Sequence, residues 1–382
     1  MSLLSGRGWR PVLLTAAMLA AVSGAGAVSE PTLESIYAGY AAGDFAIVAR
    51  DVRSPQDFRA MRLDSPKALD EWLGPWQPRK ATFMIELAAT ANQIAPARTW
   101  PIVSAGRRYV TGRRARPGAS AEPGTSAEED EFERVFHRTA IALLERHGFV
   151  TYLEQYLEAI RARTSASPAV ALADERHTLA WAIAQEQRCW NDRPDLDRAG
   201  AAADAVPRAA GQSVTSGAET SKSMQAKERE QRQACLAEAV TRFDAAAESV
   251  DAAEARVRGA WMRFQLGKYE DALRTIDGVD CGDDRELAHW AALFRGRILD
   301  ALGKYADAER AYRAALAAAP NAQSAGVGLA LALFKMDRVA DADKAAVAVR
   351  TGPAVADPWW TYAAADSRFV ERWIATLRRM SR

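Results

Sequence analysis

The sequence predicts an all-α protein that contains an array of helix-turn-helix repeats. Apolar residues recur at helical spacing along most of the 382-residue chain, and no stretch of useful length alternates apolar and polar residues as a strand does. The segment LGKY occurs at 266–269 and again, 36 positions later, at 302–305. Hydrophobic residues make up 49% of the chain, enough to form a sizeable core.

The first 27 residues have the pattern of a secretory signal peptide. A start with two arginines precedes a short apolar run at 11–22, and small residues at 25–27 supply a cleavage site. The run is too short to span a bilayer comfortably, although an uncleaved anchor is the alternative. The pattern predicts an exported protein, periplasmic or secreted in a bacterium, whose mature chain starts near Val28.

Residues 28–190 are expected to form an N-terminal α-helical region, because apolar side chains recur at helical spacing in four parts of it. Those parts are 33–52, 80–94, 131–163 and 169–190. A stretch rich in Gly, Pro and Ser between positions 106 and 131 is expected to be a long loop.

Residues 191–234 are expected to be a flexible linker. Small and polar residues dominate its first part and aromatic residues are absent throughout, while the charged second part, 221–233, is also compatible with the start of a helix. Cys189 and Cys235 flank this stretch, and a bridge between them would hold its ends together in an oxidising compartment. Burial of both as free thiols is the alternative.

Residues 235–355 are expected to form the repeats. The two LGKY segments align in register, and a weaker third copy follows 34 residues after the second. A period of this length in a helical stretch indicates a helix-turn-helix unit that stacks on its neighbours to bury its apolar face. Gly303 is expected at the turn, where a left-handed backbone is least strained without a Cβ, and Ala308 where the paired helices touch.

This pattern resembles the tetratricopeptide repeat family. In the middle unit the residues at motif positions are Gly296, Leu302, Gly303, Tyr305, Ala308, Tyr312, Ala315 and Pro320. The flanking units match less completely, and the resemblance covers roughly residues 253–358, under a third of the chain. It implies a superhelix whose inner groove, lined by the first helix of each unit, binds a peptide or protein.

The resemblance also implies which side chains face that groove. By register they are Trp261, Phe264, Trp290, Leu293, Arg297, Phe334 and Lys335, accompanied by Glu254, Val257 and Val327. Aromatic and arginine side chains dominate binding energy at interfaces, so this set is a candidate partner-binding groove. The alternative is that the rings pack beneath the N-terminal helices or the C-terminal cap.

Residues 356–382 are expected to include a helix that caps the array. Phe369, Trp373 and Leu377 fall on one helical face, and arginines give the helix a basic side. A repeat array must cover its last apolar face, which favours a cap. Contact with a membrane surface is the alternative and is not favoured.

The sequence contains no motif for catalysis, for cofactor binding or for a metal. Its four histidines belong to no HExxH pattern, and phosphate-loop, dinucleotide and nucleophile-elbow patterns are absent. The formal net charge of +1 gives no electrostatic reason to expect a nucleic-acid partner. These observations favour a non-enzymatic scaffold that binds a peptide or protein. The alternative is an envelope enzyme, hydrolase-like, with its active site in residues 30–190 and the repeats as a targeting arm.

Overall fold

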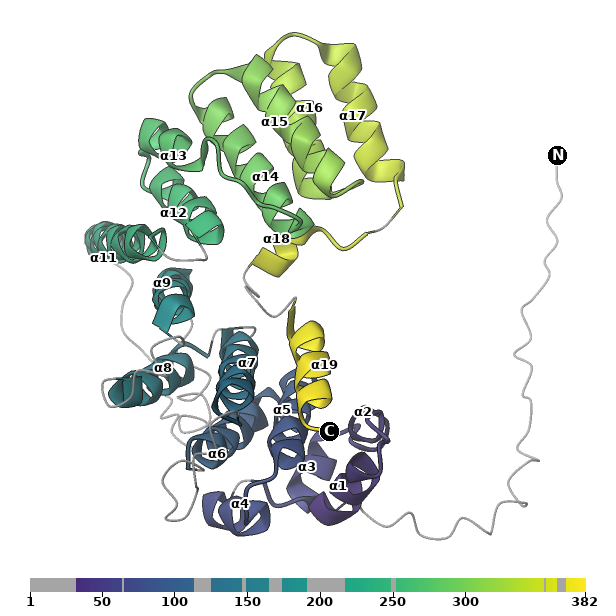
Figure 1. Ribbon diagram of the computed structural model, residues 1–382. Helices are drawn as coiled ribbons and strands as arrows, with labels where there is room; N and C mark the ends of the chain where they lie inside the picture. The colour runs from purple at the N-terminus through teal and green to yellow at the C-terminus, as the bar shows by residue number, and fades with distance from the viewer. Residues whose placement is uncertain are drawn as a thin grey trace, which may run out of the picture.

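The computed structural model of the chain describes residues 32–63, 65–112, 125–145, 149–164, 174–190, 217–248, 252–353, 355–362 and 369–382. Within these ranges all regular structure is helical, and successive helices pack on one another (Figure 1). The expected signal peptide, 1–27, and positions 191–216 of the expected linker lie outside these ranges. No helix among the described residues is long and apolar enough to cross a membrane.

The first lobe, which we call the N-terminal lobe, is built around one central helix. Its helices are α1 (Leu33–Ala41), α2 (Ile47–Asp51), α3 (Pro55–Ala60), α4 (Pro66–Leu73), α5 (Pro78–Ile94), the 3-10 helix η1 (Pro96–Arg98), α6 (Thr99–Gly112), α7 (Thr125–Glu145), α8 (Val150–Thr164) and α9 (Asp174–Trp190). Helix α5 buries side chains on nearly all sides and contacts α1, α2, α6 and α7. Capping boxes begin α1 at Thr32 and α3 at Ser54, which satisfies exposed backbone N–H groups there.

The second lobe, the repeat lobe, contains three helix pairs preceded by a long helix. Its helices are α11 (Gly217–Ala246), α12 (Ala252–Gln265), α13 (Tyr269–Ile276), α14 (Arg285–Ala301), α15 (Tyr305–Ala318), α16 (Gln323–Lys335) and α17 (Val339–Thr351), followed by the short α18 (Pro358–Thr361). Each pair contacts the next one, as expected for a helical-repeat array (Figure 1).

The three pairs share one turn geometry. Gly267, Gly303 and Asp337 occupy the same position and have φ values of 75°, 71° and 59°. In each turn the next N–H donates back to the first helix, with N–O distances of 2.9, 2.9 and 3.1 Å. An aspartate tolerates the left-handed conformation better than most residues, so the third turn forms without glycine. This similarity confirms the 36- and 34-residue periodicity.

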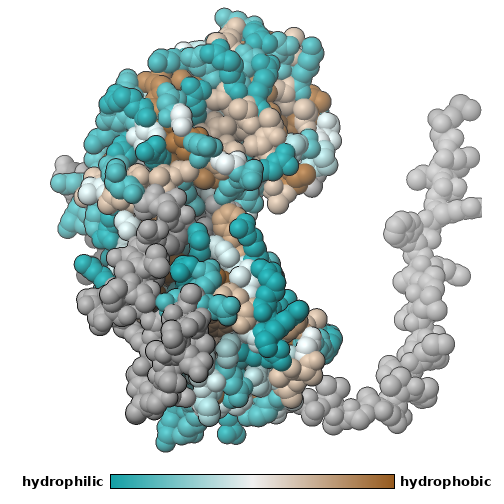
Figure 2. Space-filling model, in the orientation of Figure 1, coloured by the Kyte–Doolittle hydropathy of each residue, from teal (hydrophilic) through white to brown (hydrophobic). Residues whose placement is uncertain are grey.

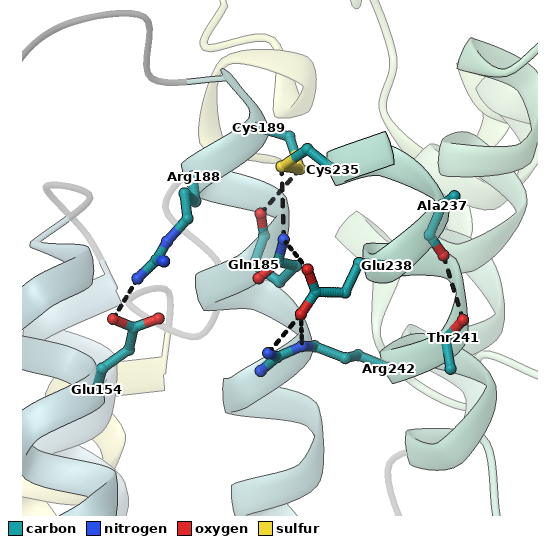
Figure 3. Close-up of polar contacts among 9 residues, drawn as sticks. All are labelled: Glu154, Gln185, Arg188, Cys189, Cys235, Ala237, Glu238, Thr241 and Arg242. Atoms are coloured by element: carbon teal, nitrogen blue, oxygen red, sulfur yellow. Dashed lines mark hydrogen bonds and ion pairs between the residues drawn. A yellow bond between two sulfur atoms is a disulfide. The ribbon is translucent and has the colours of Figure 1, made fainter. Parts of the chain in front are cut away.

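A disulfide joins the two lobes through α9 and α11. Cys189 and Cys235 are bonded, with their Cα atoms 5.6 Å apart (Figure 3). Beside the bridge, the Gln185 side chain donates to Glu238 over 3.2 Å, and Glu238 also accepts from Arg242 over 2.7 Å. The bridge that the sequence left as one of two alternatives is therefore present, supported by polar contacts between the same two helices.

The structure corrects two boundaries. Helix α11 includes residues 217–234, so the expected linker is shorter, and its charged part, 221–233, is helical as the sequence allowed. The expected loop between 106 and 131 is also shorter, because α6 extends to Gly112 and α7 begins at Thr125. Charged residues without aromatic ones are compatible with a solvated helix, and the side chains of 229–234 in α11 are exposed. Composition alone therefore underestimated helix length in both places.

The expected cap is the third correction. Helix α19 (Val370–Met380) does not cover the end of the array but packs on α5 and α7 of the N-terminal lobe. Its buried face consists of Val370, Trp373, Ile374 and Leu377. On its basic side Arg378 bonds to the buried carboxylate of Glu86, with one N–O distance of 2.7 Å. Both the apolar face and the bond to Glu86 thus hold α19 on the N-terminal lobe.

Candidate partner groove

The first helices of the three pairs are α12, α14 and α16, and α14 contacts both of the others. We call the surface formed by equivalent register positions on these helices the groove face. In the first two pairs this face is covered by the chain itself, namely by residues Asp357–Tyr362, which we call the arm. The arm contains α18, which contacts α14 and lies beside the array in Figure 1.

Polar side chains of the groove face bind the backbone and the acid of the arm. The indole N–H of Trp290 donates to the carbonyl of Pro358 over 2.6 Å, and the guanidinium of Arg258 donates to the carbonyl of Tyr362 over 3.0 Å. At the other end, the backbone N–H and the hydroxyl of Ser324 donate to the Asp357 carboxylate, at 2.6 and 2.9 Å.

Aromatic rings surround the arm between these polar contacts. Trp359 lies edge-on to Trp261 and to Phe294, with centroid distances of 5.5 and 5.8 Å. Tyr362 is edge-on to Trp290 at 5.4 Å and to Phe294 at 5.3 Å. Such edge-to-face pairs add roughly 0.5–1.5 kcal/mol each to the burial of the rings.

A buried ionic network lies beneath the arm. Arg258 donates to Glu186 of α9 and to Glu254 of α12, each over 2.9 Å, and Glu186 accepts the Tyr362 hydroxyl over 2.5 Å. Burial and the charge of Glu186 raise the pKa of Tyr362 well above its ordinary value, so this hydroxyl remains a donor. The network connects the N-terminal lobe, the array and the arm through a single guanidinium.

By exposure, the residues predicted for the groove divide into a buried group and an open group, with Phe264 between them. Trp261, Trp290 and Leu293 are buried, as are Glu254 and Val257, so the expectation that they lie open to a partner is wrong for them. The alternative, that the rings pack beneath the C-terminal part of the chain, holds for the two tryptophans. Phe264 is half-buried against Trp261, whose ring it stacks on at 4.9 Å. The remaining predicted side chains are exposed and form the open group. One of them, Lys335, is paired with Asp300 at 2.8 Å. The open residues are Arg297, Phe334 and Lys335.

The open part of the groove face is an apolar stripe on α16. Val327, Leu331 and Phe334 are spaced by four and three residues, which places them on one side of the helix, and they are 58%, 47% and 61% exposed. Among the described residues eight large apolar side chains are exposed, and seven of them lie between Val327 and Trp360. Figure 2 shows apolar surface gathered on the repeat lobe. Leu331 was not among the predicted groove residues, although it occupies the same position in its repeat as Trp261 does.

One histidine cluster in the groove superficially resembles a catalytic triad. His289 Nε2 lies 3.5 Å from Ser324 Oγ and 3.8 Å from Asp357, while Nδ1 lies 3.0 Å from the carbonyl of Ala315. In a triad the acid and the serine contact opposite ring nitrogens, whereas here both approach the same one, and the serine donates to the acid. Burial lowers the pKa of His289. This arrangement anchors the arm rather than activating a nucleophile.

A second histidine cluster lies in the N-terminal lobe. His137 Nδ1 is 2.7 Å from the hydroxyl of Tyr156, and its Nε2 is 3.5 Å from Glu133. The three side chains are buried, and His137 contacts each of the other two, so they offer no reactive atom to solvent. Among the described residues no group of three or more His, Cys, Asp or Glu side chains is arranged to hold a metal ion.

No protein-family model matches the chain, and no curated protein matches its sequence. The structure supports the class of all-α proteins with a helical-repeat array, and the similarity to the tetratricopeptide repeat family remains a resemblance.

Proposed function

We propose that the protein is an exported, non-enzymatic scaffold that binds a peptide or protein segment on the groove face of its repeats. The observation that carries this proposal is the stripe of Val327, Leu331 and Phe334. A soluble array normally covers the apolar face of its last unit, and large exposed apolar side chains that gather on one helix indicate an interaction site.

The part of the groove that the arm covers supports the same proposed function. On the first two pairs the groove face already holds a short aromatic segment, the arm, and Trp261, which contacts it, is equivalent by register to Leu331 of the stripe. The stripe continues this surface along α16 and offers the same kind of apolar contact. Arg297, exposed on the neighbouring α14, adds a cation beside it. A partner segment with apolar side chains and an acidic group would match both features.

The disulfide supports the proposal of export. Bridges between cysteines persist in oxidising compartments and are rare in reducing ones, so the Cys189–Cys235 pair suits a periplasmic or secreted protein. The alternative of contact with a membrane surface was based on the basic side of the C-terminal helix. The apolar face of that helix is buried in the N-terminal lobe and is not offered to lipid.

The rival function, an enzyme with its active site in the N-terminal lobe, would need convergent titratable side chains that a substrate can reach. The cluster around His137 converges, but it is enclosed by the core. No specific observation favours this rival, and we do not adopt it.

The proposal is tested by selecting peptides from a display library on the mature chain and measuring their affinity for two variants. Leu331→Asp places a charge in the stripe and should weaken binding at least tenfold, because apolar anchors carry most interface energy. Val347→Asp is the matched control. Val347 is 46% exposed against 47% for Leu331, but it lies on α17, the second helix of the same pair.

Both variants should melt close to the wild type, since substitutions at exposed positions change stability little. Equal affinity of the selected peptides for both variants would contradict the proposed site. A library that yields no binder of the mature chain would contradict the proposed function.

A further inference from the structure

We propose that the groove site filled by the arm is a recognition site for peptides, and that the arm is its displaceable intramolecular ligand. The peptides that fit carry the sequence Asp-Pro-Trp and a tyrosine three residues after the tryptophan. The inference deepens the proposed function, because it concerns the filled part of the same groove. It rests on how the groove face contacts the arm.

The contacts to the arm are those of peptide recognition. Trp290 and Arg258 donate to backbone carbonyls, which any peptide offers at the same spacing. Ser324 donates two hydrogen bonds to the Asp357 carboxylate, which also accepts the N–H of Trp359 over 2.9 Å and so begins the single helical turn of α18. The groove face thus recognises both ends of a six-residue segment through polar contacts.

Side-chain specificity comes from two ring positions. The first ring, Trp359, contacts Trp261 and Phe294, and the second, Tyr362, needs both a flat ring and a hydroxyl for Glu186. The tryptophan between them, Trp360, is 76% exposed and contributes no ring contact to the groove. A partner therefore requires the acid, the first aromatic ring and the tyrosine, whereas the residue at the position of Trp360 is free to vary.

The arm is attached to the array in a way that permits exchange. Pro353, Val355 and Ala356, which precede it, are exposed, so these three residues are not held in place by burial. Trp290 and Arg258 donate to backbone carbonyls of the arm, and a second segment that offers the same carbonyls can accept the same hydrogen bonds in its place.

Tethering makes the arm a strong competitor. A short tether gives an effective concentration on the order of millimolar, so a free peptide with a dissociation constant of about 10–100 µM should bind the intact chain roughly 10–100-fold more weakly than a chain whose arm is released. This difference is the quantity that the experiment measures.

The experiment uses the full mature chain and a fluorescein-labelled peptide with the sequence VADPWFTY, in which Phe replaces the exposed second tryptophan. Trp359→Ala in the chain removes the ring that the groove holds and should tighten peptide binding at least tenfold relative to the wild type. Trp360→Ala is the matched control, an adjacent tryptophan of the same helix, and should bind the peptide as the wild type does. A peptide with Ala in place of its tryptophan should bind none of the three chains.

A second measurement uses the wild-type chain alone, so that the result does not depend on how well a variant folds. Saturating unlabelled peptide should accelerate hydrogen–deuterium exchange of the chain's own amides at 359–362. Unchanged exchange there, or a folded Trp359→Ala chain that does not take up the peptide, would show that the arm is a permanent part of the core and would overturn the inference.

The two proposals fail separately. If the arm is permanent, peptides selected from the library still lose affinity in Leu331→Asp, which leaves the proposed function in place. If selected peptides ignore the stripe but VADPWFTY displaces the arm, the recognition site stands and the stripe does not.

Discussion

Tyr312 allows a prediction whose sign depends on the tertiary packing of the array. Its ring, on α15, is buried between two helical glycines, Gly296 on α14 and Gly328 on α16. A Cβ added to Gly328 would lie 2.4 Å from Cε1 of the ring, and one added to Gly296 would lie 2.7 Å from the same atom. The ring thus has a glycine on each side and little room to move away from either.

Gly328→Ala should therefore destabilise the protein, although alanine is the better helix former. The gain in helix propensity is about 1 kcal/mol, whereas forcing a methyl group into a packed contact costs about 1–3 kcal/mol. Because the ring is confined on both sides, we place the cost near the upper end, which gives a net loss of about 2 kcal/mol. In a Tyr312→Ala background the clash is absent, and the same Gly328→Ala change should stabilise by about 1 kcal/mol.

The assay is a double-mutant cycle by urea denaturation followed by circular dichroism. Tyr312→Phe serves as the control, because it keeps the ring and should keep the destabilising effect of Gly328→Ala. The reasoning would be refuted by additive effects of the two substitutions, or by a Gly328→Ala chain as stable as the wild type.

Three further outcomes are expected. Replacing Cys189 and Cys235 by alanine should lower the free energy of unfolding by about 4 kcal/mol, the chain-entropy value for their 46-residue separation, as measured by denaturation with the reduced wild type as control. Burial lowers the pKa of His289 below its unfolded value of about 6.5, so folding favours the neutral imidazole. The free energy of unfolding should therefore be highest above that pH and should fall on acidification. His289→Gln should flatten this dependence in melts between neutral and acidic pH. Arg378→Met should lower stability by on the order of 3 kcal/mol, because the buried carboxylate of Glu86 loses its ion-pair partner and keeps only the Tyr40 hydroxyl as a donor, whereas the exposed neighbour Arg379→Met should have little effect in the same melts.

The local features of the fold could be predicted from the sequence with good accuracy. Helical periodicity predicted the all-α class, and the spacing of Gly267 and Gly303 predicted the turns, because both signals depend on backbone preferences within a few residues. Ala308 was correctly expected at a close helix contact and is buried. Composition was a weaker guide, since α11 begins at Gly217 inside a stretch expected to be a linker.

The candidate groove was predicted only in part. Register placed Trp261, Trp290 and Phe334 on one face correctly, but their exposure depends on what covers that face. The arm covers the first two and leaves the third open, and no pattern in residues 357–362 announces this. An aromatic segment that binds its own chain has the same composition as one that forms a solvent-exposed turn.

The sequence by itself determined the helices, their turns, the repeat period and the two cysteines available for a bridge, because each follows from neighbours along the chain. Only the tertiary structure decided that the bridge forms, that the arm lies in the groove, and that α19 packs on the N-terminal lobe instead of the array. The last two are choices between apolar surfaces. Such a choice is decided by a few long-range polar contacts, such as Arg378 with Glu86 and Trp290 with Pro358, whose partners lie 292 and 68 positions apart in the chain.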